Sequence, residues 1–252
     1  MKAQFKGISM VFAIALLLAL ILPVTSQSAQ NDQGGVSVFP ADSSPYGRTY
    51  GEWMASWQQW ATGMPYTHHP LFDTADASTG QSGPVWFLGG KFCSLNAPNC
   101  GTNNVVRHIT IPAGKALFFP IVDTEVSTVE TGGGDVNNAN AIKDINSLRQ
   151  LAEQYTNYAT IVRLDVDGTS VPLQNFRVRS TAFGFYLPQH DIFTAVGEGT
   201  FTPGDYFPGV DDGYYVMLEP LSAGRQHTIH FHAEEPNFSW ILDITYFVQV
   251  QR

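Results

Sequence analysis

The feature that most constrains the fold is a long series of short apolar or alternating segments separated by turn-forming residues. Alternation of apolar and polar residues is typical of strands with one buried face, and a short continuous apolar run is typical of a strand buried on both faces. Pro112-Ala113-Gly114 and Asp167-Gly168 mark turns between neighbouring segments. The segments that we predict as strands are 84–90, 105–111, 115–122, 160–166, a stretch from Thr169, 175–180, 213–220, 225–232 and 241–250.

This series predicts a mainly β protein. Strands and helices do not alternate regularly along the chain, so a parallel sheet built from βαβ units is not expected. We predict an antiparallel β-sandwich or jelly roll with two inserted or peripheral helices. Neither an internal repeat nor a domain boundary is evident in residues 45–252, which we therefore predict as a single β-sandwich domain.

Two segments have the periodicity of helices. The first is expected to begin at Pro45, a residue that helix N-termini tolerate, and to end at Gly63. The second covers residues 141–156, where apolar side chains recur three or four residues apart. Asn138 or Asn140 is a candidate cap for this second helix.

One stripe of the first predicted helix is aromatic. An exposed stripe would form a stacking platform for sugars or a membrane-surface helix, whereas a buried stripe would pack against a sheet. The polar face lacks the lysines and arginines that interfacial helices use, which favours packing against a sheet. The rings of the stripe belong to Tyr46, Tyr50, Trp53, Trp57 and Trp60.

Composition excludes several classes of protein. Hydrophobic residues make up 44% of the chain and aromatic residues 13%, which is incompatible with a disordered chain or a coiled coil. The formal net charge is −9, because 13 lysines and arginines face 22 aspartates and glutamates. A protein that follows a phosphate backbone needs a basic face, so we expect no nucleic-acid partner.

The N-terminus has the pattern of a secretory signal peptide. Two lysines precede an almost entirely apolar run at 8–24, and small polar residues follow it. We predict residues 1–29 as a signal peptide, with cleavage between Ser26 and Gln30, and residues 30–44 as a linker or peripheral strand. The mature chain is then secreted or periplasmic and has no membrane span. The alternative is that the apolar run stays uncleaved as a membrane anchor.

Export changes the interpretation of the two cysteines, Cys93 and Cys100. Six residues rich in turn formers separate them. An oxidising compartment favours a local disulfide that closes this loop. Two cysteines without other ligands cannot form a cysteine zinc site, so we predict the disulfide.

Several segments resemble a family of secreted bacterial proteins of unknown function. They are YGRTYGEWMASWQQWATGMP, HPLFDTADASTGQSGPVWFLGG, IPAGKALFFPIVDTEVSTVE, DGYYVMLEPLSAGRQHTIHF and the closing DITYFVQV. Together they span roughly residues 45–250. The resemblance implies one module rather than two. It implies no activity, and no catalytic residue is carried over from it.

His230 and His232 are candidate metal ligands, because two histidines two residues apart on a strand share one face. Their spacing partly resembles the first cupin motif, but the glutamate comes too early and no second motif follows. A third ligand would have to come from elsewhere, such as Glu125, His68 or His69. The alternative is that the two histidines lie on the polar outer face of an antiparallel strand. We predict no cofactor, with a divalent metal as the alternative.

Acidic residues gather in two places. Asp123, Glu125 and Glu130 follow the predicted strand 115–122, where carboxylates could serve acid–base chemistry, a calcium site or glycoside hydrolysis. The alternative for these three is a solvated loop. The second group comprises Asp205, Asp211 and Asp212, and there we predict Asp211-Asp212-Gly213 as a turn.

These observations favour a secreted, non-catalytic β-sandwich module that binds a ligand or a surface, with a glycan as one candidate. The basis is export, aromatic richness and the lack of a complete catalytic set. The alternative is a secreted hydrolase or lyase, metal-assisted or not, that uses Glu125, His230 and His232. A pocket that holds all three side chains would favour the enzyme, and a shallow aromatic surface would favour binding.

Overall fold

The computed structural model describes residues 36–92 and 104–252. The predicted signal peptide and the Cys93–Cys100 disulfide lie outside the described residues, so both stay predictions. In the described part of the chain, no helix combines the length and the apolar character that crossing a bilayer requires.

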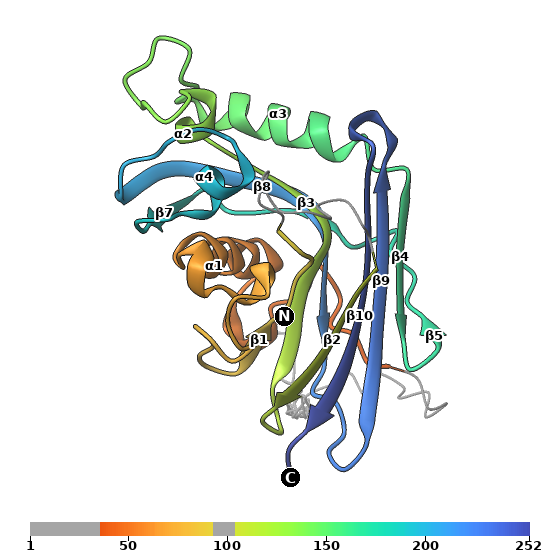
Figure 1. Cartoon of the computed structure of the whole chain (residues 1–252). Helices are drawn as coiled ribbons and strands as arrows, with labels where there is room; N and C mark the ends of the chain where they lie inside the picture. The colour runs from red at the N-terminus through yellow and green to blue at the C-terminus, as the bar shows by residue number, and fades with distance from the viewer. Residues whose placement is uncertain (1–35, 93–103) are drawn as a thin grey trace, which may run out of the picture. The chain divides into compact units, whose positions relative to one another are not determined.

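The described residues form two five-stranded sheets with helices on the first of them (Figure 1). The first sheet has the order β1-β3-β8-β6, with β7 also paired to β8, and the second has the order β2-β10-β9-β4-β5. The strands are β1 (Val85–Phe87), β2 (Asn104–Ile111), β3 (Ala116–Ser127), β4 (Ile161–Val166), β5 (Thr169–Ser170), β6 (Arg177–Arg179), β7 (Phe183–Leu187), β8 (Gly204–Leu218), β9 (Gln226–Glu235) and β10 (Trp240–Val250). The helices are α1 (Tyr50–Thr62), α2 (Thr128–Thr131), α3 (Ile145–Thr156) and α4 (Ile192–Val196).

The predicted mainly β, two-sheet architecture is confirmed, but two strand pairs are parallel. β1 pairs with β3 and β2 pairs with β10 in parallel, while the other ladders are antiparallel. The expectation of purely antiparallel sheets therefore needs correction. For β1 and β3, the reason is that the chain passes from β1 in the first sheet to β2 in the second and back to β3. Two reversals restore the direction of the chain, so a parallel pair forms without a βαβ unit.

The main hydrophobic core lies between the two sheets. Alternate residues of β3, such as Leu117 and Phe119, face alternate residues of the second sheet, such as Phe231 and Ile244. The rings of Phe119 and Phe231 stack with centroids 5.3 Å apart. The period-two pattern that predicted the strands is therefore the pattern that fills this core.

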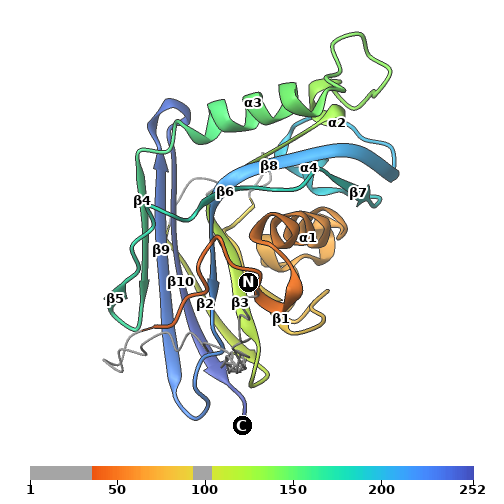
Figure 2. The same cartoon turned by 180° about the vertical axis from the view of Figure 1, so that it is seen from behind.

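Helix α1 covers the opposite face of the first sheet, so that the first sheet separates α1 from the second sheet (Figures 1 and 2). The indole of Trp57 is 2% exposed, and its N–H donates to the Leu88 carbonyl at 2.6 Å. Trp53 and Trp60 are also buried and donate to backbone carbonyls. The predicted packing of the aromatic stripe on a sheet is confirmed, except that Tyr46 is 44% exposed.

Both long helices begin later than predicted. Residues Pro45–Gly47 form a separate 3-10 turn, because Tyr46 and Gly47 have positive φ values that an α-helix cannot accommodate. Thr49 then caps α1 through a capping box with Glu52. Helix α3 is capped by Asp144 rather than by an asparagine.

Strands β3 and β8 are both longer than predicted. Strand β3 continues through the acidic segment to Ser127, so Asp123 and Glu125 lie within a strand and not in a solvated loop. Strand β8 runs through Asp211-Asp212-Gly213, so the predicted turn at this position is wrong. Backbone pairing of Glu125 with Asp211 and of Asp123 with Gly213 holds both acidic segments in the ladder. Helix α3 packs over this end of the sheet through Leu148 and Ala152.

Burial of Trp57 predicts that its truncation destabilises the protein. Trp57→Ala removes a buried indole and its hydrogen bond, so we expect the free energy of unfolding to fall by about 3–5 kcal/mol. Denaturant unfolding measures this change. Tyr46→Ala, which truncates the exposed ring of the same stripe, is the matched control and should cost much less. An unchanged midpoint for Trp57→Ala would contradict the packing described.

Candidate functional site

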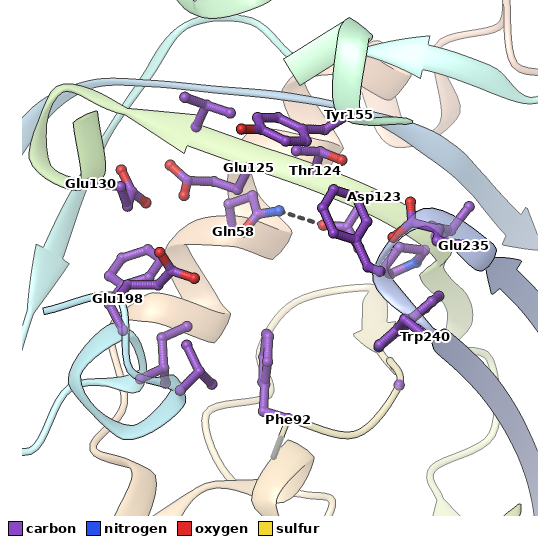
Figure 3. A pocket seen from close by; sticks show the side chains of 18 of the residues that line it. Gln58, Phe92, Asp123, Thr124, Glu125, Glu130, Tyr155, Glu198, Glu235 and Trp240 are labelled. Atoms are coloured by element: carbon purple, nitrogen blue, oxygen red, sulfur yellow. Dashed lines mark hydrogen bonds between the residues drawn. The ribbon is translucent and has the colours of Figure 1, made fainter. Parts of the chain in front are cut away.

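A cavity of about 860 Å³ lies beside residues Pro120 to Val126, the C-terminal half of β3, and we call it the β3 cleft. Its walls come from α1, from α2 to α4, from residues 90–92 and from the end of the β9–β10 hairpin. Carboxyl groups from several of these elements gather around it (Figure 3). They belong to Asp123, Glu125, Glu130, Glu198 and Glu235.

A β-bulge in β3 turns two of these carboxyl groups toward α1. Before the bulge, the even-numbered Ala116 and Phe118 contact α1. The register against β8 then shifts by one residue between Pro120 and Val122. An extra residue exchanges the two faces of a strand, so the odd-numbered Asp123 and Glu125 now lie on the α1 side.

The side chain of Gln58 on α1 connects this part of β3 with β8. Its amide nitrogen donates to Asp123 at 2.8 Å and to Asp211 at 3.0 Å. The hydroxyl of Tyr215 donates to the same Asp211 oxygen at 2.6 Å. Asp211 is 1% exposed, and its other oxygen has no hydrogen-bond partner. We call Gln58, Asp123, Asp211 and Tyr215 the buried acid network.

Glu125 lies next to this network but receives no donor from it. Both of its carboxylate oxygens are buried and receive no amide or hydroxyl donor from the described residues, and the group that can share a hydrogen bond with them, when either is protonated, is the carboxyl of Glu130. Its neighbour across the ladder is Asp211, and like charges directly opposite each other on a sheet are destabilising. Its other close neighbour is the carboxyl of Glu130. One Glu130 oxygen accepts from Ser127, and the other is also unpartnered.

Burial raises the pKa values of four carboxyl groups, those of Asp123, Glu125, Asp211 and Glu235. Desolvation raises the pKa of Asp123 to about 6, although the hydrogen bonds from Tyr215 and Gln58 oppose the shift. Desolvation, and secondarily the charge of Asp123, raises the pKa of Glu235 to about 7. The pKa of Glu125 lies well above its usual value because of burial and repulsion from Glu130, and burial likewise raises that of Asp211.

Aromatic side chains line the cleft and its edge. Phe92, which follows β1, and Trp240, the first residue of β10, both line the cavity (Figure 3). At the edge, the rings of Tyr155, Tyr158 and Phe238 lie with their centroids 5.4 to 6.1 Å apart. Phe238 is 51% exposed, so part of this aromatic group is open to solvent.

The structure does not bring the predicted Glu125, His230 and His232 together. Glu125 lines the β3 cleft, whereas neither histidine does. His230 and His232 share one face of β9, as their spacing predicted, but both contact Asp243 on the neighbouring strand at 3.0 Å. The second ring nitrogen of His232 contacts Glu234 at 2.8 Å. The side chain of His230 is 40% exposed, which matches the alternative of a polar outer face.

The proposed third metal ligands are also separate from this pair. His69 is fully buried, accepts from the Leu71 N–H at 3.0 Å, and its other ring nitrogen donates to the Ala61 carbonyl at 2.8 Å. Burial lowers its pKa to about 4, so the ring is neutral at physiological pH. His68 is exposed. Within residues 36–92 and 104–252, no group of three or more histidine, cysteine, aspartate and glutamate side chains has the arrangement of a metal site.

Several residues of the cleft were missed by sequence reasoning. Gln58 carries no motif, and Tyr215 is one aromatic residue among many. Glu235 follows the histidines of β9 but belongs to no motif. Asp211 was assigned to a turn, although Asp211 and Tyr215 lie four residues apart in one strand and so share a face. That spacing could have indicated that Asp211 and Tyr215 are neighbours, but only if residues 211–215 had been recognised as a strand.

Comparison with known proteins finds no matching family model and no matching curated protein. A chain from the structure of PbICP-C in complex with falcipain-2 is 13% identical, with a TM-score of 0.22, over 67% of this chain and 100% of that chain. A chain from the solution structure of Amebosin is 13% identical, with a TM-score of 0.19, over 59% of this chain and 96% of that chain. At these TM-scores neither likeness assigns a fold family or a function. The resemblance to a secreted bacterial family stays a prediction.

The raised pKa of Asp123 predicts a pH-dependent cost in stability. Its pKa is about 6 in the folded protein against an ordinary 3.8, so its contribution to stability is present below pH 3.8 and lost as the pH rises through 6. Asp123→Asn removes this titration. We expect the stability of the variant relative to wild type to grow between pH 4 and pH 7.5, by roughly 2.4 kcal/mol.

Denaturant unfolding of both proteins across this pH range measures the difference. Asp205→Asn removes an exposed carboxyl group from the same strand as Asp211 and is the matched control. A stability difference between Asp123→Asn and wild type that does not change with pH would contradict the account of Asp123.

Proposed function

We propose that this chain is an exported, non-catalytic module that binds a small ligand, and that the β3 cleft is its binding site. The observation that carries the proposal is Glu125, whose two buried oxygens have no donor and which lines a cavity of about 860 Å³. A buried carboxyl without partners costs free energy that folding does not recover. A ligand with hydrogen-bond donors would recover it.

The composition of the cleft supports binding of an organic ligand. Cavities of this size with mostly apolar walls and a few convergent polar groups are typical of small-molecule sites. Here the apolar walls include Trp57, Phe92 and Trp240, and the polar groups are the carboxyls. Glycans remain one candidate ligand, because aromatic rings pack on sugar faces and carboxylates accept from hydroxyl groups. The signal-peptide pattern supports an extracellular or periplasmic ligand.

A second candidate function is acid–base hydrolysis. The observation that favours it is that Asp123 and Glu235 line one cleft with pKa values of about 6 and about 7. Carboxyl groups with pKa values near neutrality are suited to general acid or general base roles. This version of the enzyme uses the cleft carboxyls, since His230 and His232 lie elsewhere. Turnover of aryl glycosides by the purified protein, lost in Glu235→Gln, would support hydrolysis over binding alone.

The binding proposal predicts that Glu125 controls ligand affinity. Tryptophan fluorescence reports on the cleft because Trp57 and Trp240 line it. The probes are two series at equal ionic strength, neutral oligosaccharides such as chitotriose and aliphatic amines such as putrescine. We expect saturable binding in at least one series and a loss of about tenfold or more in Glu125→Gln, because a charge-assisted hydrogen bond is removed.

The control for this experiment is Glu219→Gln, which neutralises an exposed carboxyl group outside the cleft. It should bind like wild type. Absence of saturable binding in both series, or equal binding by Glu125→Gln and wild type, would overturn the proposed site.

A further inference from the structure

The side chains that line the β3 cleft carry an unbalanced charge. Its lining includes the five carboxyl groups already named and one cationic side chain, Lys91. The ammonium of Lys91 lies 3.5 Å from Asp73, which also pairs with Arg107 at 2.7 Å. None of the salt bridges formed by the described residues involves Asp123, Glu125, Glu130 or Glu235. Among the described residues, the cation at the cleft is therefore Lys91, which is engaged by Asp73 and not by the cleft carboxyls.

The buried hydrogen-bond donors at the cleft are engaged within the protein, while Thr124, Tyr155 and Trp240 add further donors to its lining. Gln58 and Tyr215 already donate to Asp123 and Asp211. Thr131, another lining residue, donates to the Ser127 carbonyl. Among the buried side-chain atoms of the cleft lining, those that receive no amide or hydroxyl donor are carboxylate oxygens, namely both oxygens of Glu125 and one of Glu130. A sugar hydroxyl is both donor and acceptor, whereas an ammonium group has three donors and no acceptor, so the ammonium is the better complement.

Four of the five carboxyl groups form two pairs along the cleft, and Glu198 is not part of either pair. Glu125 lies beside Glu130 at one end, and Asp123 lies on the side of Glu235 at the other (Figure 3). Asp123 and Glu125 are two residues apart on β3, which separates their backbones by about 7 Å. Apolar and aromatic side chains, including Trp57 and Phe92, line the space around them.

From these observations we propose that the ligand of the β3 cleft is an aliphatic diamine or polyamine, with one ammonium group at Glu125 and Glu130 and another at Asp123 and Glu235. The methylene chain between the ammonium groups packs against the apolar walls. Aromatic faces near the ends, such as that of Trp240, add cation–π attraction. This inference rests on the proposed function of the cleft.

Binding of an ammonium ligand is linked to proton release. The groups that titrate at or beneath the cleft are Asp123 and Glu125 on β3, Glu130 on α2, Tyr155 on α3, Glu198 after α4, Asp211 and Tyr215 on β8, Glu235 on β9 and Lys91. The raised pKa values of Asp123 and Glu235 mean that both groups are largely protonated at pH 5 and ionised at pH 8. A cation binds the ionised forms, so its affinity rises with pH over this range.

Titration calorimetry with putrescine and spermidine on the full mature chain tests the inference, with chitotriose as the neutral probe. In 150 mM salt we expect one putrescine per chain, bound at least tenfold more tightly at pH 8 than at pH 5. Glu125→Gln should lose at least tenfold in affinity for putrescine at pH 8, and the control Glu219→Gln should not. Spermidine should follow the same pattern.

The other outcomes distinguish failure of the proposed ligand class from failure of the proposed binding function. Binding of chitotriose, sensitive to Glu125→Gln, with no binding of either amine, would overturn the ligand class and leave the proposed binding function standing. Amine binding that Glu125→Gln does not weaken would show attraction to the acidic surface only, and would overturn the inference. An amine affinity that does not change with pH would also overturn it. Failure of all three probes would count against both the inference and the proposed function.

Discussion

Strand β3 packs against different elements along its length, and the bulge at Ile121 exchanges the faces that it presents to them. Before the bulge, the strand packs one face on the second sheet and the other on α1. Beyond it, Val126 packs under α3, and the opposite face carries Asp123 and Glu125 toward Gln58 and the cleft. A strand without the extra residue would place both carboxyl groups on the α3 side. The cleft therefore depends on one inserted residue in one ladder.

The carboxyl groups of the β3 cleft and of the buried acid network lower the stability of the fold, and contacts among the described residues offset this cost only in part. Gln58 and Tyr215 supply donors to Asp123 and Asp211, but none reaches Glu125. Two buried ionisable groups elsewhere in the described residues have partners. His69 is equally buried, yet both of its ring nitrogens have partners. Asp212, the neighbour of Asp211, is buried and paired with Arg177 at 2.8 Å. Unpaired carboxyls confined to the wall of a cavity are the arrangement expected where function opposes stability.

Local pattern in the sequence was sufficient for the mainly β two-sheet class, for most of the strands and for the two long helices, but not for the parallel pairs or for the full lengths of β3 and β8. The alternation in 241–250 predicted β10, and the aromatic periodicity predicted α1, because both patterns reflect burial of one face. Glu125 was identified as a candidate from its position near an apolar run. The environment of Glu125 could not be predicted from local pattern. The extension of β3, the bulge at Ile121 and the pairing with Asp211 all depend on β8, and Asp211 lies 86 residues from Glu125 in the chain. The spacing of His230 and His232 would allow both to bind one metal ion, but Asp243 on the adjacent strand contacts both.

The central claim is that the β3 cleft holds carboxyl groups without compensating charge in the free protein. Carbon-detected NMR titration of the side-chain carboxyl groups tests it most directly, with Asp123→Asn, Glu125→Gln and Glu235→Gln used to assign the signals. We expect Asp123 to titrate near pH 6, Glu235 to titrate near pH 7 and Glu125 to titrate well above the usual range for glutamate. Titration of all three groups at the ordinary values of exposed carboxyl groups, near pH 4, would contradict it.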